Sequence, residues 1–200
     1  MLSQPVQLIL ASASPRRKAL MEQIGLSFKT HASSVYEPPY TGRLPAEYAM
    51  ELAQLKASVI ADQYPSALIV GSDTIVIVDE QVLGKPVDAN AAFEMLTLLS
   101  GRTHQVVTAY SLQLKDRAIV QNHFMTTQVH FRHLDFDEIN KYIGSGDPFD
   151  KAGAYGIQDY SGVFVDKIEG CFYNVVGFPL SDFNIKLKYL LAEYNLTLKH

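Results

Sequence analysis

Length, composition and charge restrict the classes of protein to which this chain can belong. Its 200 residues are 48% hydrophobic and 19% charged, which is typical of a globular protein with a sizeable core. The net charge of −4 gives no general attraction for nucleic acid or for an anionic membrane surface. Without a signal peptide or an apolar run long enough to span a membrane, we expect a cytoplasmic protein. The single cysteine, Cys171, excludes an internal disulfide and is interpreted as a small core residue.

Residues 8–25 predict a buried strand, a tight turn and a helix. Ser14 is a good N-cap and Pro15 suits the first helical position. Arg16 and Arg17 then stand in the first turn, where the helix dipole disfavours each cation by roughly 0.3–1 kcal/mol. A bound anion would reverse that penalty, because backbone N–H groups and two guanidinium groups would converge on it. We therefore favour a phosphate site over the alternative of two solvated surface arginines.

The rest of the chain alternates between predicted helices and predicted strands. A loop with two prolines and a glycine is expected at 35–42. Helices are expected over 45–63, 88–101, 135–144 and 179–194. Strands are expected over 68–70 and 74–78 (one long strand or two collinear ones), 106–114 paired with 119–131, 162–165 and 172–176. This order predicts an α/β protein with a mixed sheet.

Asp73 interrupts the most apolar strand pattern of the chain, within Gly71-Ser72-Asp73-Thr74. A carboxylate in such surroundings is costly unless it is paired or bound to a metal. One interpretation makes Asp73 a general base or a Mg²⁺ ligand. The alternative is a turn, since Ser-Asp-Thr is common in turns. The apolar residues on both sides favour the functional interpretation.

Two further segments carry residues suited to a nucleotide. Gly84-Lys85-Pro86 would hold Lys85 on a defined loop. In 147–158, small residues would let a ligand approach the backbone, while Tyr155 and Gln158 are suited to stacking on a base and reading its edge. The glycine spacing matches neither a Walker loop nor a dinucleotide-binding fingerprint.

The charged candidates together suit a polyphosphate bridged by a divalent cation. Lys56 lies on or beside an apolar helix face, and Glu37 lies in the proline-rich loop. The cations are Arg16, Arg17, Lys56, Lys85 and Lys151, and the carboxylates are Glu37, Asp73 and Asp150. Such oxygen ligands suit Mg²⁺, although Mn²⁺ would also fit. No histidine is placed to activate a serine or cysteine nucleophile.

Five blocks of the chain, in this order, resemble the Maf family of nucleoside triphosphate pyrophosphatases. They are Leu10-Ala11-Ser12-Ala13-Ser14-Pro15-Arg16-Arg17, Gly71-Ser72-Asp73-Thr74, Gly84-Lys85-Pro86, Leu99-Ser100-Gly101-Arg102-Thr103-His104 and Asp150-Lys151-Ala152-Gly153-Ala154-Tyr155-Gly156-Ile157-Gln158. The resemblance implies one domain over residues 1–200, with an elongated two-lobed α/β fold, a central mixed β-sheet flanked by helices and a cleft between the lobes. It also implies metal-dependent hydrolysis of a nucleoside triphosphate to the monophosphate and pyrophosphate, and it allows a homodimer.

The last block resembles the branch of the family that acts on dTTP and UTP. On that resemblance Asp73 would be the proton acceptor, while Arg16, Thr74 and Gln158 would set substrate choice. The remaining implied roles are catalysis by Lys56 and Lys85, substrate binding by Ser12, Arg17 and Lys151, and metal binding by Glu37, Asp73 and Asp150. Two alternatives stay open: the branch acting on 7-methyl-GTP, and a nucleotide-binding regulator of cell division and septum formation without turnover.

Overall fold

The computed structural model describes residues 3–199, whose contacts group into two compact units. The first unit combines the chain up to Asp73 with residues 108–124 and the chain from Gly177 onward. The second unit combines residues 74–107 with residues 125–176. Strands β4 (Leu68–Val78), β6 (Thr103–Leu114) and β7 (Ile119–Phe131) contribute residues to both units.

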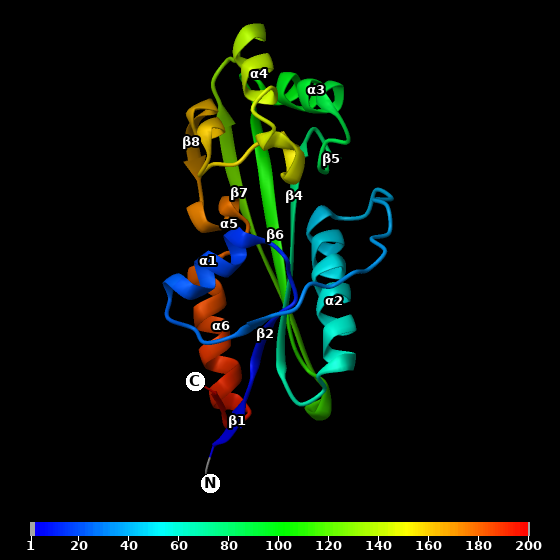
Figure 1. Ribbon diagram of the computed structural model, residues 1–200, viewed down its shortest axis with the longest axis vertical. Helices are drawn as coiled ribbons and strands as arrows, with labels where there is room; N and C mark the ends of the chain where they lie inside the picture. Colours follow the sequence, from blue (N-terminus) through cyan, green and yellow to red (C-terminus); the bar gives the residue numbers. More distant parts are fainter. Residues whose placement is uncertain (1–2, 200) are drawn as a thin grey trace. The chain divides into compact units, whose positions relative to one another are not determined.

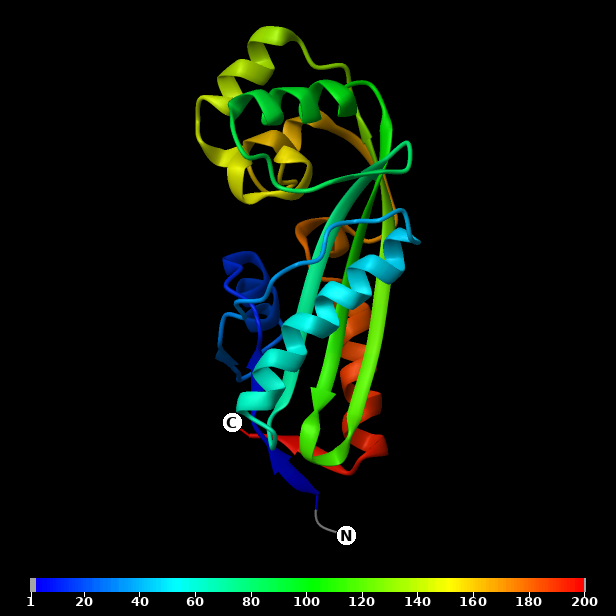
Figure 2. The ribbon, with the colours of Figure 1, turned by 90° about the vertical axis from the view of Figure 1, so that its right-hand side faces the viewer.

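Part of the first unit consists of parallel strands. The strand β2 (Leu8–Leu10) pairs in parallel with β3 (Lys29–Thr30) on one side and with β4 on the other. Helix α2 (Pro45–Gln63) lies on one face of these strands and helix α6 (Leu180–Glu193) on the opposite face (Figures 1 and 2). The short strands β1 (Gln4–Val6) and β9 (Leu196–Leu198) also pair in parallel. A short 3₁₀ helix, Lys115–Arg117, joins β6 to β7.

Helix α2 packs unusually close to β4, and small residues make this approach feasible. A Cβ atom added to Gly71 would lie 2.3 Å from the carbonyl oxygen of Ala53 and 2.6 Å from the backbone nitrogen of Ala57. Both alanines are fully buried, and Ile60 and Ile69 fill the space beside them. The helix backbone therefore runs directly over the strand that carries Asp73.

Helix α1 (Pro15–Gln23) begins where the sequence predicts. The Ser14 side chain accepts a hydrogen bond from the backbone N–H of Arg17, and Pro15 occupies the first helical position. The turn between β2 and α1 thus fixes the direction in which both arginines leave the backbone.

The second unit packs two capped helices around an apolar core. Helix α3 (Ala89–Leu99) is capped by Asp88, and helix α4 (Phe136–Ile143) is capped by Asp135. The strand β5 (Gln81–Leu83) pairs antiparallel with β4, and β8 (Val165–Glu169) pairs antiparallel with β7. The remaining segments are the 3₁₀ helices Asp147–Asp150, Ala152–Ala154 and Tyr160–Phe164 and the helix α5 (Phe172–Val176).

Most predicted elements are confirmed, including the mixed sheet and the single long strand over 68–78. Two are wrong. Residues 162–165 were expected to form a strand, but a 3₁₀ helix runs to Phe164 and β8 begins at Val165. Residues 172–176 form helix α5, whose Asn174 side chain donates to the Val106 carbonyl oxygen and to Thr127 Oγ1. A five-residue segment is too short to reveal its own periodicity, so tertiary contacts decided the outcome.

The remaining expectations concern Cys171, the short strands and membrane-spanning helices. Cys171 is half-buried, which corrects its interpretation as a core residue. The short strands β1, β3, β5 and β9 had no sequence prediction. Among residues 3–199, none of the helices is both long and apolar enough to cross a lipid bilayer. The single domain, the elongated shape and the cleft between lobes stay predictions.

Candidate active site

Asp73 is a buried strand residue of β4, so the turn alternative is wrong. Its neighbour Ser72 is fully buried and donates a hydrogen bond to the carbonyl oxygen of Ala109, 2.8 Å away. A hydroxyl can donate a hydrogen bond to a carbonyl oxygen in this way, but an ionised carboxylate has no proton to donate. Asp73 therefore needs a cationic partner close by.

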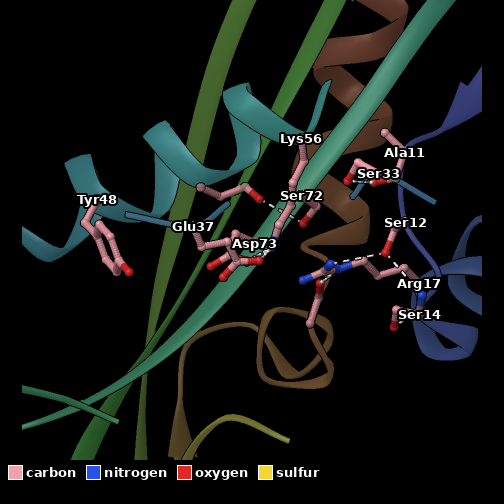
Figure 3. A network of polar contacts seen from close by, with 12 residues as sticks. Ala11, Ser12, Ser14, Arg17, Ser33, Glu37, Tyr48, Lys56, Ser72 and Asp73 are labelled. Atoms are coloured by element: carbon pink, nitrogen blue, oxygen red, sulfur yellow. Dashed lines mark hydrogen bonds and ion pairs between the residues drawn. The ribbon is translucent and has the colours of Figure 1, made fainter. Parts of the chain in front are cut away.

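Lys56 supplies that cation from helix α2. Its Nζ lies 2.6 Å from Asp73 Oδ1 and 2.7 Å from Oε1 of Glu37, which comes from the loop before the helix (Figure 3). The Lys56 and Asp73 side chains are only 15% and 11% exposed, whereas the Glu37 side chain is 49% exposed. The structure thus brings together a lysine and two carboxylates that the sequence predicted as separate candidate site residues.

The surroundings of Asp73 make it a stronger base than an ordinary aspartate. Burial raises its pKa, while the positive charges of Lys56 and Arg17 lower it and the charge of Glu37 raises it. Burial prevails, so the pKa of Asp73 lies above its usual range. A carboxylate with a raised pKa takes a proton more readily near neutral pH, as general-base catalysis requires.

Arg17 is held in place by its own turn and by a distant segment of the same unit. Its Nε donates to the Gly177 carbonyl oxygen at 3.0 Å, and one terminal nitrogen lies 3.3 Å from Ser12 Oγ. Ser12 Oγ also accepts from the backbone N–H of Ser14. Burial lowers the pKa of Arg17, and the charge of Asp73 opposes that effect. Figure 3 shows the guanidinium group pointing toward Asp73, a fixed positive charge near the proposed base.

The predicted substrate ligands Arg16 and Thr74 are half-buried, and each makes contacts within the protein. Arg16 lies in the first turn of α1, and Thr74 follows Asp73 on β4. In the second unit, the backbone N–H of Gly153 donates to the carbonyl oxygen of Gly84 at 3.0 Å. This bond brings the loop of Lys85 beside the segment that leads to Gln158. The Lys85 and Gln158 side chains are both exposed.

Tyr155 and Lys151 do not lie as the sequence suggested. The Tyr155 ring packs edge-to-face against His104 and Phe131 in the core, and its hydroxyl lies 2.7 Å from His104 Nε2. Its interpretation as a platform for a base is therefore wrong. The Lys151 side chain is buried, and its Nζ lies 2.7 Å from Asp150 Oδ1. Apolar character decided the place of the tyrosine, and an ion pair that of the lysine.

Three residues that hold these side chains in place were not predicted from the sequence. Tyr48 donates from its hydroxyl to the carbonyl oxygen of Pro38, and so fixes the loop that carries Glu37. Burial and the charge of Asp73 raise the pKa of Tyr48. Its spacing of eight residues from Lys56 places both on one face of α2, a signal that could have revealed it. Gly177 accepts a hydrogen bond from Arg17, and Asp159 Oδ2 lies 3.2 Å from Lys151 Nζ. These long-range and turn contacts left no local pattern in the sequence.

The donor set of the first unit fits a divalent metal that is completed by substrate. Among residues 3–199, no three His, Cys, Asp or Glu side chains form a group that could hold an ion. Glu37 and Asp73 belong to the first unit, whereas Asp150 belongs to the second and contacts Lys151 there, so the predicted set of three ligands stays a prediction. The carboxylates of Glu37 and Asp73 nevertheless both contact the Nζ atom of Lys56. Mg²⁺ is commonly held by one or two carboxylates together with substrate phosphates.

Curated relatives match along nearly the whole chain. A protein of Syntrophomonas wolfei called dTTP/UTP pyrophosphatase is 45% identical over 172 residues, which cover 86% of this chain and 91% of the relative. A Bacillus cereus protein of the same name is 41% identical over 194 residues, covering 97% of this chain and 98% of its own.

Solved structures with low sequence identity share the fold. A HAM1 protein from Coxiella burnetii superimposes with a TM-score of 0.54 at 15% identity, over 92% of this chain and 99% of its own. The Ham1 protein of Staphylococcus aureus gives the same TM-score at 16% identity, over 94% of this chain and 99% of its own. The family model described as "Maf-like protein" matches residues 7–190. With the relatives at 41–45% identity, this match places the chain in the Maf family.

Proposed function

We propose that this protein is a nucleoside triphosphate pyrophosphatase that converts dTTP and UTP to the monophosphate and pyrophosphate. The observation that carries the proposal is the buried Asp73 carboxylate, with its raised pKa, held 2.6 Å from Lys56 and near the anchored Arg17. The printed names of relatives at 41–45% identity support the same reaction.

In the proposed reaction, Asp73 accepts a proton from the attacking water. The water oxygen forms a bond to the α-phosphorus, and the bond from that phosphorus to the bridging oxygen breaks. Pyrophosphate leaves with the electron pair of the broken bond. Arg17 neutralises charge on phosphate oxygens, and Ser12 keeps its guanidinium oriented for that task. Lys56 keeps Asp73 ionised and so ready to accept the proton.

A divalent cation, Mg²⁺ or Mn²⁺, belongs to this proposal, with Glu37 and Asp73 as its protein ligands. When bound, the cation supplies neutralisation of phosphate charge. Lys56 would then have to share or yield the two carboxylate oxygens that it contacts.

Substrate choice in the proposal depends on Arg16, Thr74 and Gln158, and Lys85 assists catalysis. The family resemblance carries these roles, and the exposure of Gln158 and Lys85 to solvent is consistent with contact to a ligand. A cytoplasmic location also belongs to the proposal. The homodimer stays a prediction.

Pyrophosphate release from dTTP, UTP and 7-methyl-GTP in the presence of Mg²⁺ tests the proposal. We expect release from the two pyrimidine nucleotides, reduced about 10²-fold or more by Asp73→Asn, since the amide cannot accept the proton. Asp62→Asn is the matched control, because Asp62 is an exposed partner of Lys115 in the same unit. Nucleotide binding without release would instead support the regulator, and full activity of Asp73→Asn would refute the assignment of the base.

A further inference from the structure

Lys151 uses all its hydrogen-bond donors inside the protein. Its side chain is 8% exposed, and its Nζ lies 2.5 Å from the Asp147 carbonyl oxygen, 2.7 Å from Asp150 Oδ1 and 3.2 Å from Asp159 Oδ2. An ammonium group has three N–H donors, which matches these three oxygens. Burial opposes the charge, but the bonds to Asp150 and Asp159 prevail and raise the pKa of Lys151, so it stays charged. A phosphate oxygen would have to displace one of these partners.

These contacts close the segment from 151 to 159 into a loop whose ends meet at the lysine. Gly156 makes the closure feasible, since a Cβ atom there would lie 2.6 Å from Asp159 Oδ2 and 2.8 Å from Lys151 Cε. The backbone N–H of Asp159 donates to the Gly156 carbonyl oxygen at 3.1 Å. The backbone N–H of Gly156 donates to Ser161 Oγ at 2.9 Å. The backbone on both sides of the exposed Gln158 is therefore fixed by named bonds.

We propose that Lys151 is a positioning residue: through Asp159 it fixes the backbone that presents Gln158, and it does not bind the triphosphate. The inference replaces the prediction that Lys151 is a phosphate ligand, and it rests on the proposed function only in the role of Gln158 in base choice. The two assignments differ in a measurable way. Loss of a phosphate ligand weakens turnover of every triphosphate equally, whereas loss of a positioning contact weakens discrimination between bases.

UTP and CTP are the matched substrates for this test, because they share sugar and triphosphate and differ only in the base. The ratio of their kcat/KM values is measured for the wild type, Lys151→Met, Asp159→Asn and the double variant. We expect each single change to lower the UTP preference about tenfold. Because both residues act through one contact, the double variant should lose little more than either single variant. Lys167→Met is the control, since Lys167 is an exposed partner of Glu169 in the same unit.

The possible outcomes separate the inference from the proposed function. A wild type that releases no pyrophosphate from UTP refutes the proposed function. A wild type that prefers UTP, with variants that lose the same factor on both substrates, makes Lys151 a phosphate ligand and overturns the inference. Should Lys151→Met fail to fold by circular dichroism, the isosteric Asp159→Asn decides alone. A lysine that binds phosphate predicts an unchanged base preference in that variant, and positioning predicts a reduced one.

Discussion

Replacing Lys56 by methionine removes the charge that holds Asp73 ionised while keeping most of the side-chain volume. Removing one partner of a buried ion pair costs about 3–5 kcal/mol. Because Lys56 and Asp73 retain 15% and 11% exposure, we use the lower end of that range. The free energy of unfolding should therefore fall by about 3 kcal/mol. Without the positive charge and the hydrogen bond of Lys56, the pKa of Asp73 rises further above its usual range. The Asp73 carboxyl then stays protonated, and unable to act as a base, to a higher pH.

The assay is pyrophosphate release from UTP across the pH range in which the protein stays folded. The acid limb of kcat/KM should move to higher pH in Lys56→Met, with partial recovery of activity at high pH. Lys115→Met is the matched control, since Lys115 contacts Asp62 at 2.7 Å but both side chains are more than half exposed. An exposed pair contributes about 1 kcal/mol or less, so its pH profile should match the wild type. A uniform loss of rate in Lys56→Met at every pH would refute the reasoning.

Three further predictions concern packing, pH and the anchored arginine. Gly71→Ala should destabilise the protein by about 1–3 kcal/mol or more in urea unfolding, because the new Cβ would meet backbone atoms of α2. Gly84→Ala is the control: a Cβ atom there enters open space, so its stability should equal that of the wild type. Burial lowers the pKa of His104 to about 4, so the free energy of unfolding should fall by about 3 kcal/mol as the pH drops from 6.5 toward 4. This loss should be smaller in His104→Gln. An unchanged dependence of stability on pH in that variant would contradict the prediction. Arg17→Lys cannot keep both the Nε bond and the bond to Ser12, so KM for UTP should rise about tenfold; an unchanged KM would remove Arg17 from phosphate binding.

Local sequence signals were sufficient to predict the helices that begin at a capping residue or at a proline. Ser14 and Pro15 determined the start of α1, and Asp88 and Asp135 determined the starts of α3 and α4. The three capping residues act through bonds to neighbouring backbone N–H groups, and Pro15 acts through its fixed backbone angle, so the sequence alone could place them. The apolar run around Asp73 likewise predicted a costly carboxylate, and the structure confirms its burial.

The remainder depended on partners that lie far away in the sequence or in an adjoining turn. Helix α5 is held by side-chain bonds of Asn174 to residues 47 and 68 positions away. Tyr155 lies in the core because His104 and Phe131 surround it there. The contacts of Lys151 depend on the turn at Gly156 that brings Asp159 back. No pattern of spacing could have separated such a lysine from a phosphate ligand.

The bond from Arg17 to Gly177 has a consequence for the order of events during synthesis. The two residues are 160 positions apart, so the arginine emerges from the ribosome long before its acceptor is made. The pairing of β1 with β9 joins still more distant parts of the chain. Contacts of such long range slow folding, because loop-closure entropy must be lost before they form. The nascent chain would therefore lack an anchored Arg17 until residue 177 has been added, and catalytic competence would be among the last properties that the protein acquires.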